Sequence, residues 1–279
     1  MARALPPSPL RTPWRWAVAG ALLGAMLALA AFAPATWLAR WVAAQSGQRL
    51  LLADARGTLW SGSAVAVLGG GPGSRDARAL PGRLHWRLRA GLRGPGGAGG
   101  PGLELALRQE CCIDDALRVR AQPGIGRLRL AIDRAAPAHA HWPAAWLAGL
   151  GAPFNTLHLG GSLQLQAEDL SVEWVQGRVR LAGQAELRLQ DLSSRLSTLP
   201  ALGSYRLVLS GAQDPAEGTR LALQTLRGPL RLSGHGHWAG AKLRFRGQAE
   251  AEPGSEAMLN NLLNLLGQRQ GPLALLAIG

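Results

Sequence analysis

The sequence predicts a mostly β protein: a single N-terminal transmembrane helix followed by an extended, twisted, mainly antiparallel β-sheet domain with a few short helices. An uncharged segment of 24 residues, Trp16 to Ala39, indicates the helix. Apolar residues that recur at every second position through most of the remaining chain indicate the strands. Short, glycine-containing connections between these stretches favour a meander of antiparallel strands over βαβ units.

The uncharged segment, residues 16–39, is predicted to be a transmembrane helix, because crossing the hydrocarbon core takes about 20 apolar residues. Residues 1–15 are then a short cytoplasmic N-terminus, since three arginines and no acidic residue lie there. Residues 40–279 follow as a β-rich domain on the far side of the membrane. Tryptophans lie near both expected interfaces: Trp14, Trp16, Trp37 and Trp41.

A cleaved signal peptide is the alternative for this segment. Ala31-Phe32-Ala33 has the small-x-small form that a signal peptidase accepts. Cleavage there would leave Pro34 as the first mature residue, which disfavours it, and the apolar run continues to Leu38. We therefore predict a retained anchor.

Basic residues outnumber acidic residues, 30 against 17, and the formal net charge is +13. A protein with this excess of positive charge is suited to contact anionic lipid or an acidic partner. We expect no nucleic-acid partner, because the predicted anchor places the domain outside the cytoplasm and no basic helix or aromatic stacking platform is visible. Only Lys242 is a lysine, and the composition is typical of a GC-rich genome, so a single arginine carries little information.

Apolar residues alternate with Arg and Gln along most of the chain after the anchor, which is typical of antiparallel strands with one buried and one wet face. The alternating positions are Leu84, Trp86 and Leu88; Leu103, Leu105 and Leu107; Leu128, Leu130 and Ile132; Leu163 and Leu165; Val172 and Trp174; Val179 to Leu189; Leu207 and Leu209; Leu221 and Leu223; Leu230 and Leu232; and Leu243 and Phe245. Turns are predicted at Gly160-Gly161, Gly177, Gly203-Ser204, residues 214–218, Gly228-Pro229 and Gly240.

Four segments interrupt the alternation. Arg40 to Leu52 is predicted to be a short interfacial helix, and the glycine-rich residues 91–102 a flexible loop. A short helix from Pro143 is expected within a crossing at residues 135–155, which would join two β-rich halves. Glu256 to Leu266 is predicted to be an amphipathic helix that packs on the sheet.

No group of residues converges on a chemical reaction, so we expect no enzyme, no cofactor and no metal. Gly94 to Gly99 matches G-x-G-x-x-G, but Gly100-Pro101-Gly102 follows where a dinucleotide site needs a helix. No serine has the G-x-S-x-G setting of a hydrolase nucleophile. Two His-x-His pairs have no third ligand nearby in the sequence: His139 with His141, and His235 with His237.

The two cysteines are adjacent, Cys111 and Cys112, which is not the spacing of a redox or zinc motif. We expect partly buried thiols. A vicinal or an intermolecular disulfide is the alternative in an oxidising compartment.

One segment just beyond the anchor stands out: Gly57, Thr58, Leu59, Trp60 and Gly62, in the sequence GTLWSG. We expect it to be the first strand of the sheet, with its glycines at bends. Further segments follow it in order: residues 202–207 (LGSYRL), 228–234 (GPLRLSG), 245–249 (FRGQA) and 262–267 (LLNLLG).

In this order the segments resemble the N protein of the bacterial type II secretion system, also called general secretion pathway protein N. The resemblance implies an accessory, single-pass inner-membrane subunit whose residues 40–279 form a non-catalytic periplasmic scaffold. Such a subunit serves the export of folded proteins across the outer membrane, and its partners are other type II secretion subunits. The alternative is a membrane-anchored, AsmA-like protein that handles lipid in an apolar β-groove.

Overall fold

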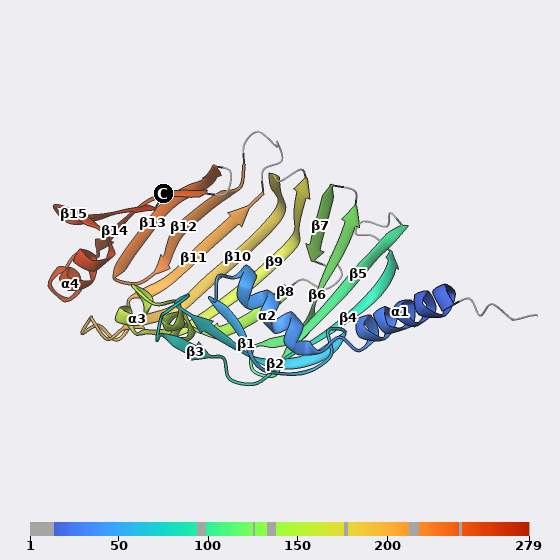
Figure 1. The fold of residues 1–279 in the computed structure, drawn as a ribbon. Helices are drawn as coiled ribbons and strands as arrows, with labels where there is room; N and C mark the ends of the chain where they lie inside the picture. Colours follow the sequence, from blue (N-terminus) through green and yellow to red (C-terminus); the bar gives the residue numbers. More distant parts are fainter. Residues whose placement is uncertain are drawn as a thin grey trace, which may run out of the picture.

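The computed structural model describes residues 14–93, 99–124, 126–132, 138–175, 178–211, 218–239 and 242–278. Within these residues, sixteen strands form one curved sheet in which all paired strands are antiparallel (Figure 1). The strands are β1 (Leu50–Gly57), β2 (Ser61–Gly69), β3 (Ala77–Ala79), β4 (Leu84–Arg93), β5 (Gly99–Gln109), β6 (Ile113–Gly124), β7 (Arg127–Ile132), β8 (Ala138–Pro143), β9 (Leu159–Val175), β10 (Arg178–Ser194), β11 (Gly203–Ser210), β12 (Arg220–Arg227), β13 (Leu230–Ala239), β14 (Lys242–Ala251), β15 (Gln268–Gln270) and β16 (Leu273–Ile278).

The strands lie in the sheet almost in chain order, which confirms the predicted antiparallel meander. The order is β1-β2-β4-β5-β6-β7-β9-β10-β11-β12-β13-β14-β16-β15, with β3 beside β2 and β8 beside β9. Every alternating stretch identified in the sequence lies in one of these strands. Neighbouring strands in a chain-ordered sheet need only short connections, which explains the frequent turn residues.

The predicted turns have different outcomes. Gly228-Pro229 separates β12 from β13, as predicted. The turn predicted at Gly160-Gly161 is wrong, because both residues lie in β9; Gly161 has φ +102° and faces a register shift in β10. Gly203-Ser204 begins β11 rather than a turn. Gly177, Gly240, residues 214–217 of the predicted turn at 214–218, and residues 94–98 of the predicted loop at 91–102 lie outside the described residues. The described ends of that loop prediction are wrong, because residues 91–93 belong to β4 and residues 99–102 to β5.

The uncharged segment 16–39 lies on two helices, α1 (Trp14–Ala31) and α2 (Ala35–Gln45). Pro34 precedes α2 in an extended conformation, with φ −70° and ψ 147°, and breaks the run of helix. The helix predicted at Arg40 to Leu52 is correct only for its first half, since residues 50–52 belong to β1. None of the helices in the described ranges combines the length and the apolar character needed to span a membrane.

The central segment contains the short helix predicted after Pro143, here a 3-10 helix, η1 (Ala144–Leu150), followed by α3 (Phe154–Leu157). The sheet is continuous past this segment, because β9 pairs with β8 through one part of its length and with β7 through another. Residues 133–137 of the expected crossing lie outside the described residues.

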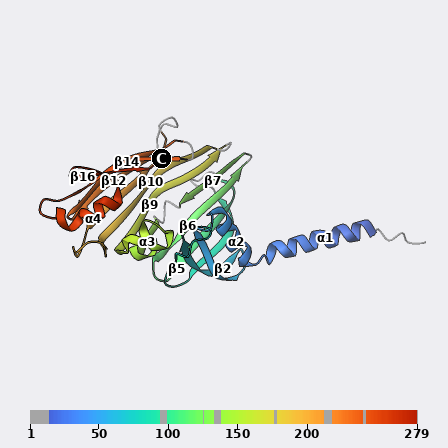
Figure 2. The same ribbon diagram turned by 60° about the vertical axis from the view of Figure 1, so that its left-hand side comes forward.

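The main core lies at the C-terminal end of the sheet, where α4 (Glu256–Leu266) packs on the strands as predicted. Leu259, Leu262 and Leu263 of α4 are each at most 1 % exposed, and they pack in one cluster with Tyr205 and Leu230. Figure 2 shows α4 at the end of the molecule opposite α1. A smaller cluster of Ala35, Ala64 and Trp86 joins α2 to the N-terminal strands.

Candidate interaction surfaces

The segment from Gly57 to Gly62 is the tight connection between β1 and β2, so the expectation that it forms the first strand is wrong. Gly57 has φ +90°, a left-handed conformation that favours glycine and ends β1. The Thr58 amide donates to the Ser61 carbonyl at 2.9 Å, and the Ser61 amide donates to Thr58 Oγ1 at 3.2 Å. These two hydrogen bonds close the turn. We call residues 57–62 the signature turn.

The signature turn is bonded to the N-terminal helices. Trp60 Nε1 donates to the Ala30 carbonyl in α1 at 2.8 Å, and the Leu59 amide donates to the Ala33 carbonyl at 2.8 Å. Ala30 lies in the last turn of α1, where carbonyls lack intrahelical donors, and Ala33 lies between α1 and α2. The turn thus joins the end of α1 to the sheet.

Trp86 lies against the signature turn and explains the second glycine. Its side chain is 3 % exposed, and its Nε1 lies 3.2 Å from the Thr58 carbonyl oxygen and 3.1 Å from that of Leu59. A Cβ atom on Gly62 would lie 2.5 Å from Cζ2 of Trp86 and 2.6 Å from the carbonyl oxygen of Arg56. Only glycine fits at this position without a shift of the backbone.

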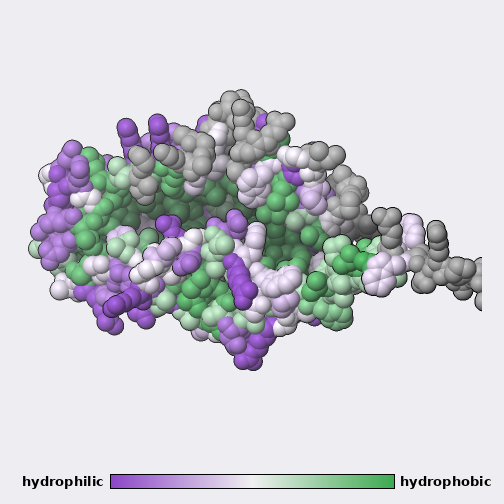
Figure 3. All heavy atoms as spheres, viewed as in Figure 1, coloured by the Kyte–Doolittle hydropathy of each residue, from purple (hydrophilic) through white to green (hydrophobic). Residues whose placement is uncertain are grey.

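The inner face of the sheet, the face on which α4 packs, carries continuous apolar rows. Leu165, Leu187, Leu207 and Leu223 are register neighbours across β9, β10, β11 and β12. They are only half-buried, and Figure 3 shows apolar surface gathered in a hollow over this side of the molecule. A second half-buried row crosses the N-terminal strands: Leu88, Leu105, Val119 and Ile132.

The opposite, outer face is polar and carries a buried carboxylate. Glu186 is 7 % exposed and forms ion pairs with Arg188 and Arg206, which lie directly opposite each other on β10 and β11. The hydrogen bond from Arg206 lowers the pKa of Glu186 below its usual value, against the opposing effect of burial, and Arg188 adds to the lowering. The carboxylate therefore bridges two like charges that would otherwise repel across the strands.

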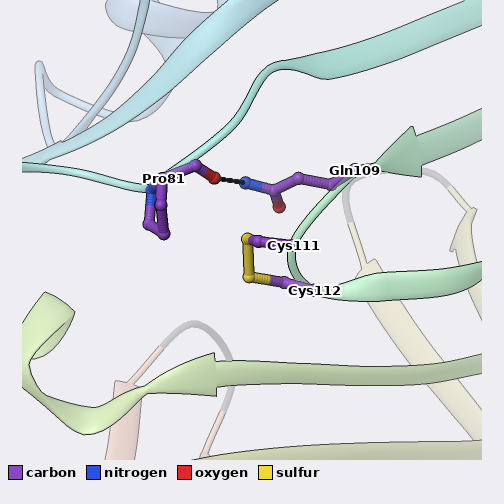
Figure 4. The surroundings of a disulfide bond; sticks show 4 residues. All are labelled: Pro81, Gln109, Cys111 and Cys112. Carbon is purple, nitrogen blue, oxygen red and sulfur yellow. Dashed lines mark hydrogen bonds between the residues drawn. A yellow bond between two sulfur atoms is a disulfide. The ribbon is translucent and has the colours of Figure 1, made fainter.

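Cys111 and Cys112 form a vicinal disulfide between β5 and β6, so the expectation of free thiols is wrong and the alternative is correct (Figure 4). Their adjacency brings the two sulfur atoms together within one turn. Cys112 is 2 % exposed, and its carbonyl accepts a hydrogen bond from the His141 amide at 2.8 Å. The neighbouring Gln109 side chain donates to the Pro81 carbonyl at 3.3 Å. The turn is thus held between β8 and the loop before β4.

The two His-x-His pairs lie on different strands, β8 and β13. His235 and His237 lie opposite Arg246 and Arg244 of β14, whose positive charges disfavour a cation there. Within the described ranges, no three His, Cys, Asp or Glu side chains gather as a metal site would require.

The sheet is open, and among the described residues its strand order ends at β1 and β15. Leu52 and Ala55 of β1 pack in the cluster that contains Leu38 of α2. All three residues of β15, in contrast, are exposed. The edge at β15 therefore presents backbone amides and carbonyls that another strand can pair with.

The fold defines a class of protein with N-terminal helices bonded to a single open antiparallel sheet that has an apolar inner face and a free edge. Residues 48–275 match the family model described as type II secretion system (T2SS), protein N. The chain belongs to this family, as the resemblance implied. Searches of curated proteins and of solved structures found no significant match.

Membership in this family makes the chain a component of the type II secretion system. Because that system is part of the cell envelope, the family implies an envelope location for the chain. The family is not known as an enzyme, and membership implies interaction with other type II secretion components. The match begins two residues before β1 and includes the signature turn and α4. The region matched by the family model therefore covers the sheet and does not include α1.

Proposed function

We propose that this protein is an accessory, non-catalytic scaffold subunit of the type II secretion system, with its sheet in the periplasm. The family match over residues 48–275 carries the proposal. The open sheet supports it, because a scaffold needs surfaces that other subunits can bind. Both a free strand edge and an apolar face are present.

The proposed attachment to the inner membrane is through residues 16–39, with residues 1–15 cytoplasmic. Leu22, Met26 and Leu27 in α1 are each more than 60 % exposed, and so is Phe32 just beyond it. Such a continuous exposed apolar surface on a helix needs a cover, which a bilayer supplies. The expected result is that the protein stays with membranes after carbonate extraction, with an intact N-terminus. A chain that starts at Pro34 would contradict the anchor.

The edge at β15 is the proposed contact with another secretion subunit, since an exposed edge strand accepts a strand from a partner. We expect a photo-crosslinking residue at Gln268 or Gln270 to form an adduct in intact cells. Mass spectrometry of the adduct should identify peptides of a type II secretion subunit.

The matched control places the same crosslinker at Gln224, an exposed glutamine of β12 that is separated from β15 by three strands. We expect adducts at the edge and few or none at Gln224. Equal labelling at both sites, or edge adducts that contain no secretion subunit, would argue against docking through β15.

Lipid handling of the AsmA-like kind is the second candidate function, and the open apolar rows on the inner face favour it. A half-buried leucine row is a surface on which acyl chains can pack. A photo-crosslinker at Leu223, on the inner face, tests this candidate against its neighbour Gln224, which faces outward. Lipid adducts at residue 223 alone would support lipid handling, and their absence at both positions would exclude it in favour of the scaffold.

A further inference from the structure

Four arginines gather on the outer face of three neighbouring strands. Arg87 in β4 and Arg118 in β6 are the cross-strand neighbours of Ala106 in β5. Arg89 lies two residues beyond Arg87, and Arg108 two residues beyond Ala106, so all four side chains lie on one face. All four are exposed.

These arginines line a shallow pocket of about 470 Å³, which we call the arginine pocket. Ala106 and Ala116 also line it, and their small side chains leave the space open. The lining includes the carboxylate of Glu104, which lies 3.8 Å from Nε of Arg120. Among the described residues, none of the ion pairs involves Arg87, Arg89, Arg108 or Arg118. The pocket therefore has an excess of positive charge.

The arginine pocket lies beside the point where α1 meets the sheet. Ser61 and Gly62 of the signature turn form part of its lining, and Trp60 in the same turn is hydrogen-bonded to Ala30 of α1. Figures 1 and 2 show α1 leaving the molecule next to β2. The positive charge thus lies close to the end of the helix that we place in the membrane.

We propose that the arginine pocket binds the headgroups of anionic phospholipids in the membrane that holds α1. A guanidinium group matches a phosphate with two parallel hydrogen bonds, and it is weakly hydrated, so it is suited to this contact. An acidic protein segment would match the charge too, but the place of the pocket beside α1 favours lipid. The inference rests on the proposed membrane anchor and not on the secretion role. If the arginine pocket binds lipid headgroups, the outer face of β4, β5 and β6 lies toward the bilayer.

The test uses the full chain, purified in a neutral detergent and titrated with phosphatidylglycerol or phosphatidylcholine. Native mass spectrometry counts the bound lipids. We expect selective binding of phosphatidylglycerol. The combined substitutions Arg87→Gln, Arg89→Gln, Arg108→Gln and Arg118→Gln should weaken it by at least about tenfold. One arginine near an anionic lipid surface contributes about fivefold, so four additive contributions would reach about 600-fold.

Two further variants separate a pocket from a simple charge effect. A control removes the same charge elsewhere, through Arg180→Gln, Arg195→Gln, Arg244→Gln and Arg246→Gln, and should keep selective binding. Ala106→Phe fills the pocket without any change in charge and should weaken binding. The eight substituted arginines are all exposed, and circular dichroism checks that each variant is folded.

The proposal would be overturned if the pocket variant and the control variant with four substitutions each weakened phosphatidylglycerol binding equally. It would also be overturned if the wild-type chain bound phosphatidylglycerol and phosphatidylcholine equally. A wild-type pocket that binds a polyglutamate peptide but not phosphatidylglycerol would overturn it in favour of an acidic protein partner. A strain that secretes normally without this chain would refute the secretion role and leave the lipid result intact. Carbonate extraction is a separate experiment that tests the proposed membrane anchor. Its result is independent of the lipid titration.

Discussion

At the scale of single residues, Tyr205 has a central structural role at the C-terminal end of the sheet. It is the single tyrosine of the chain, it is 1 % exposed, and its hydroxyl donates to the Leu230 carbonyl at 2.9 Å. Burial raises the pKa of Tyr205 above its ordinary value. The phenol should therefore fail to titrate by ultraviolet absorbance near pH 10 until the protein unfolds.

Tyr205→Phe should destabilise the protein by about 1–3 kcal/mol, because a buried carbonyl would lose its hydrogen-bond donor. Urea unfolding of the detergent-purified chain measures the change in the free energy of unfolding. A change below about 0.5 kcal/mol, the range of neutral surface substitutions, would contradict this role.

Glu186→Gln should also destabilise the protein, by about 1–3 kcal/mol at neutral pH, because two arginines lose a buried carboxylate. The lowered pKa of Glu186 sets the sign of the pH effect. A carboxyl group with a lowered folded-state pKa stabilises the fold above its unfolded pKa of about 4.3. That stabilisation is lost as the pH falls through the folded-state pKa.

The difference in stability between wild type and Glu186→Gln should therefore be largest near pH 7 and shrink as the pH falls below about 4. Glu168→Gln is the matched control, since Glu168 is exposed. A difference that does not change with pH would mean that the ion pairs do not stabilise the fold.

At the scale of secondary-structure elements, α4 holds the core by one apolar side. Leu262 is 1 % exposed, whereas Leu265 on the same helix is 45 % exposed. Leu262→Ala should cost about 2–5 kcal/mol through lost burial and a cavity. Leu265→Ala should change stability by about 0.5 kcal/mol or less. Chemical denaturation of both variants measures the contrast, and similar losses in the two would show that α4 does not pack as described.

Helix α4 and the strands β4, β5, β7 and β9 to β14 were predictable because each has a clear period. Glu256 to Leu266 repeats its leucines at helical spacing, and the strands alternate at spacing two. The signature turn was not predictable in this way. Thr58, Leu59 and Trp60 alternate like a strand, and the positive φ of Gly57 and the contact with α1 depend on residues distant in sequence.

At the scale of the whole molecule, the sequence predicted the meander but not the surfaces that it creates. The strands β1, β2, β3, β6, β8, β15 and β16 were missed. Small residues obscure the alternation in β2, and polar residues obscure it in β6. The arginine pocket was not visible either. Its arginines lie on three strands, and each one alone looks like an ordinary solvated residue. Only the register of β4, β5 and β6 brings them together.

The open sheet, the free edge at β15 and the family match together support an accessory role for this protein in type II secretion. The most direct test is deletion of the chain from its own bacterium, followed by measurement of exoproteins in the medium and the periplasm. We expect that exoproteins fall in the medium of the deletion strain and accumulate in its periplasm, and that the wild-type chain restores export. Unchanged exoprotein levels in the medium of the deletion strain would contradict this role.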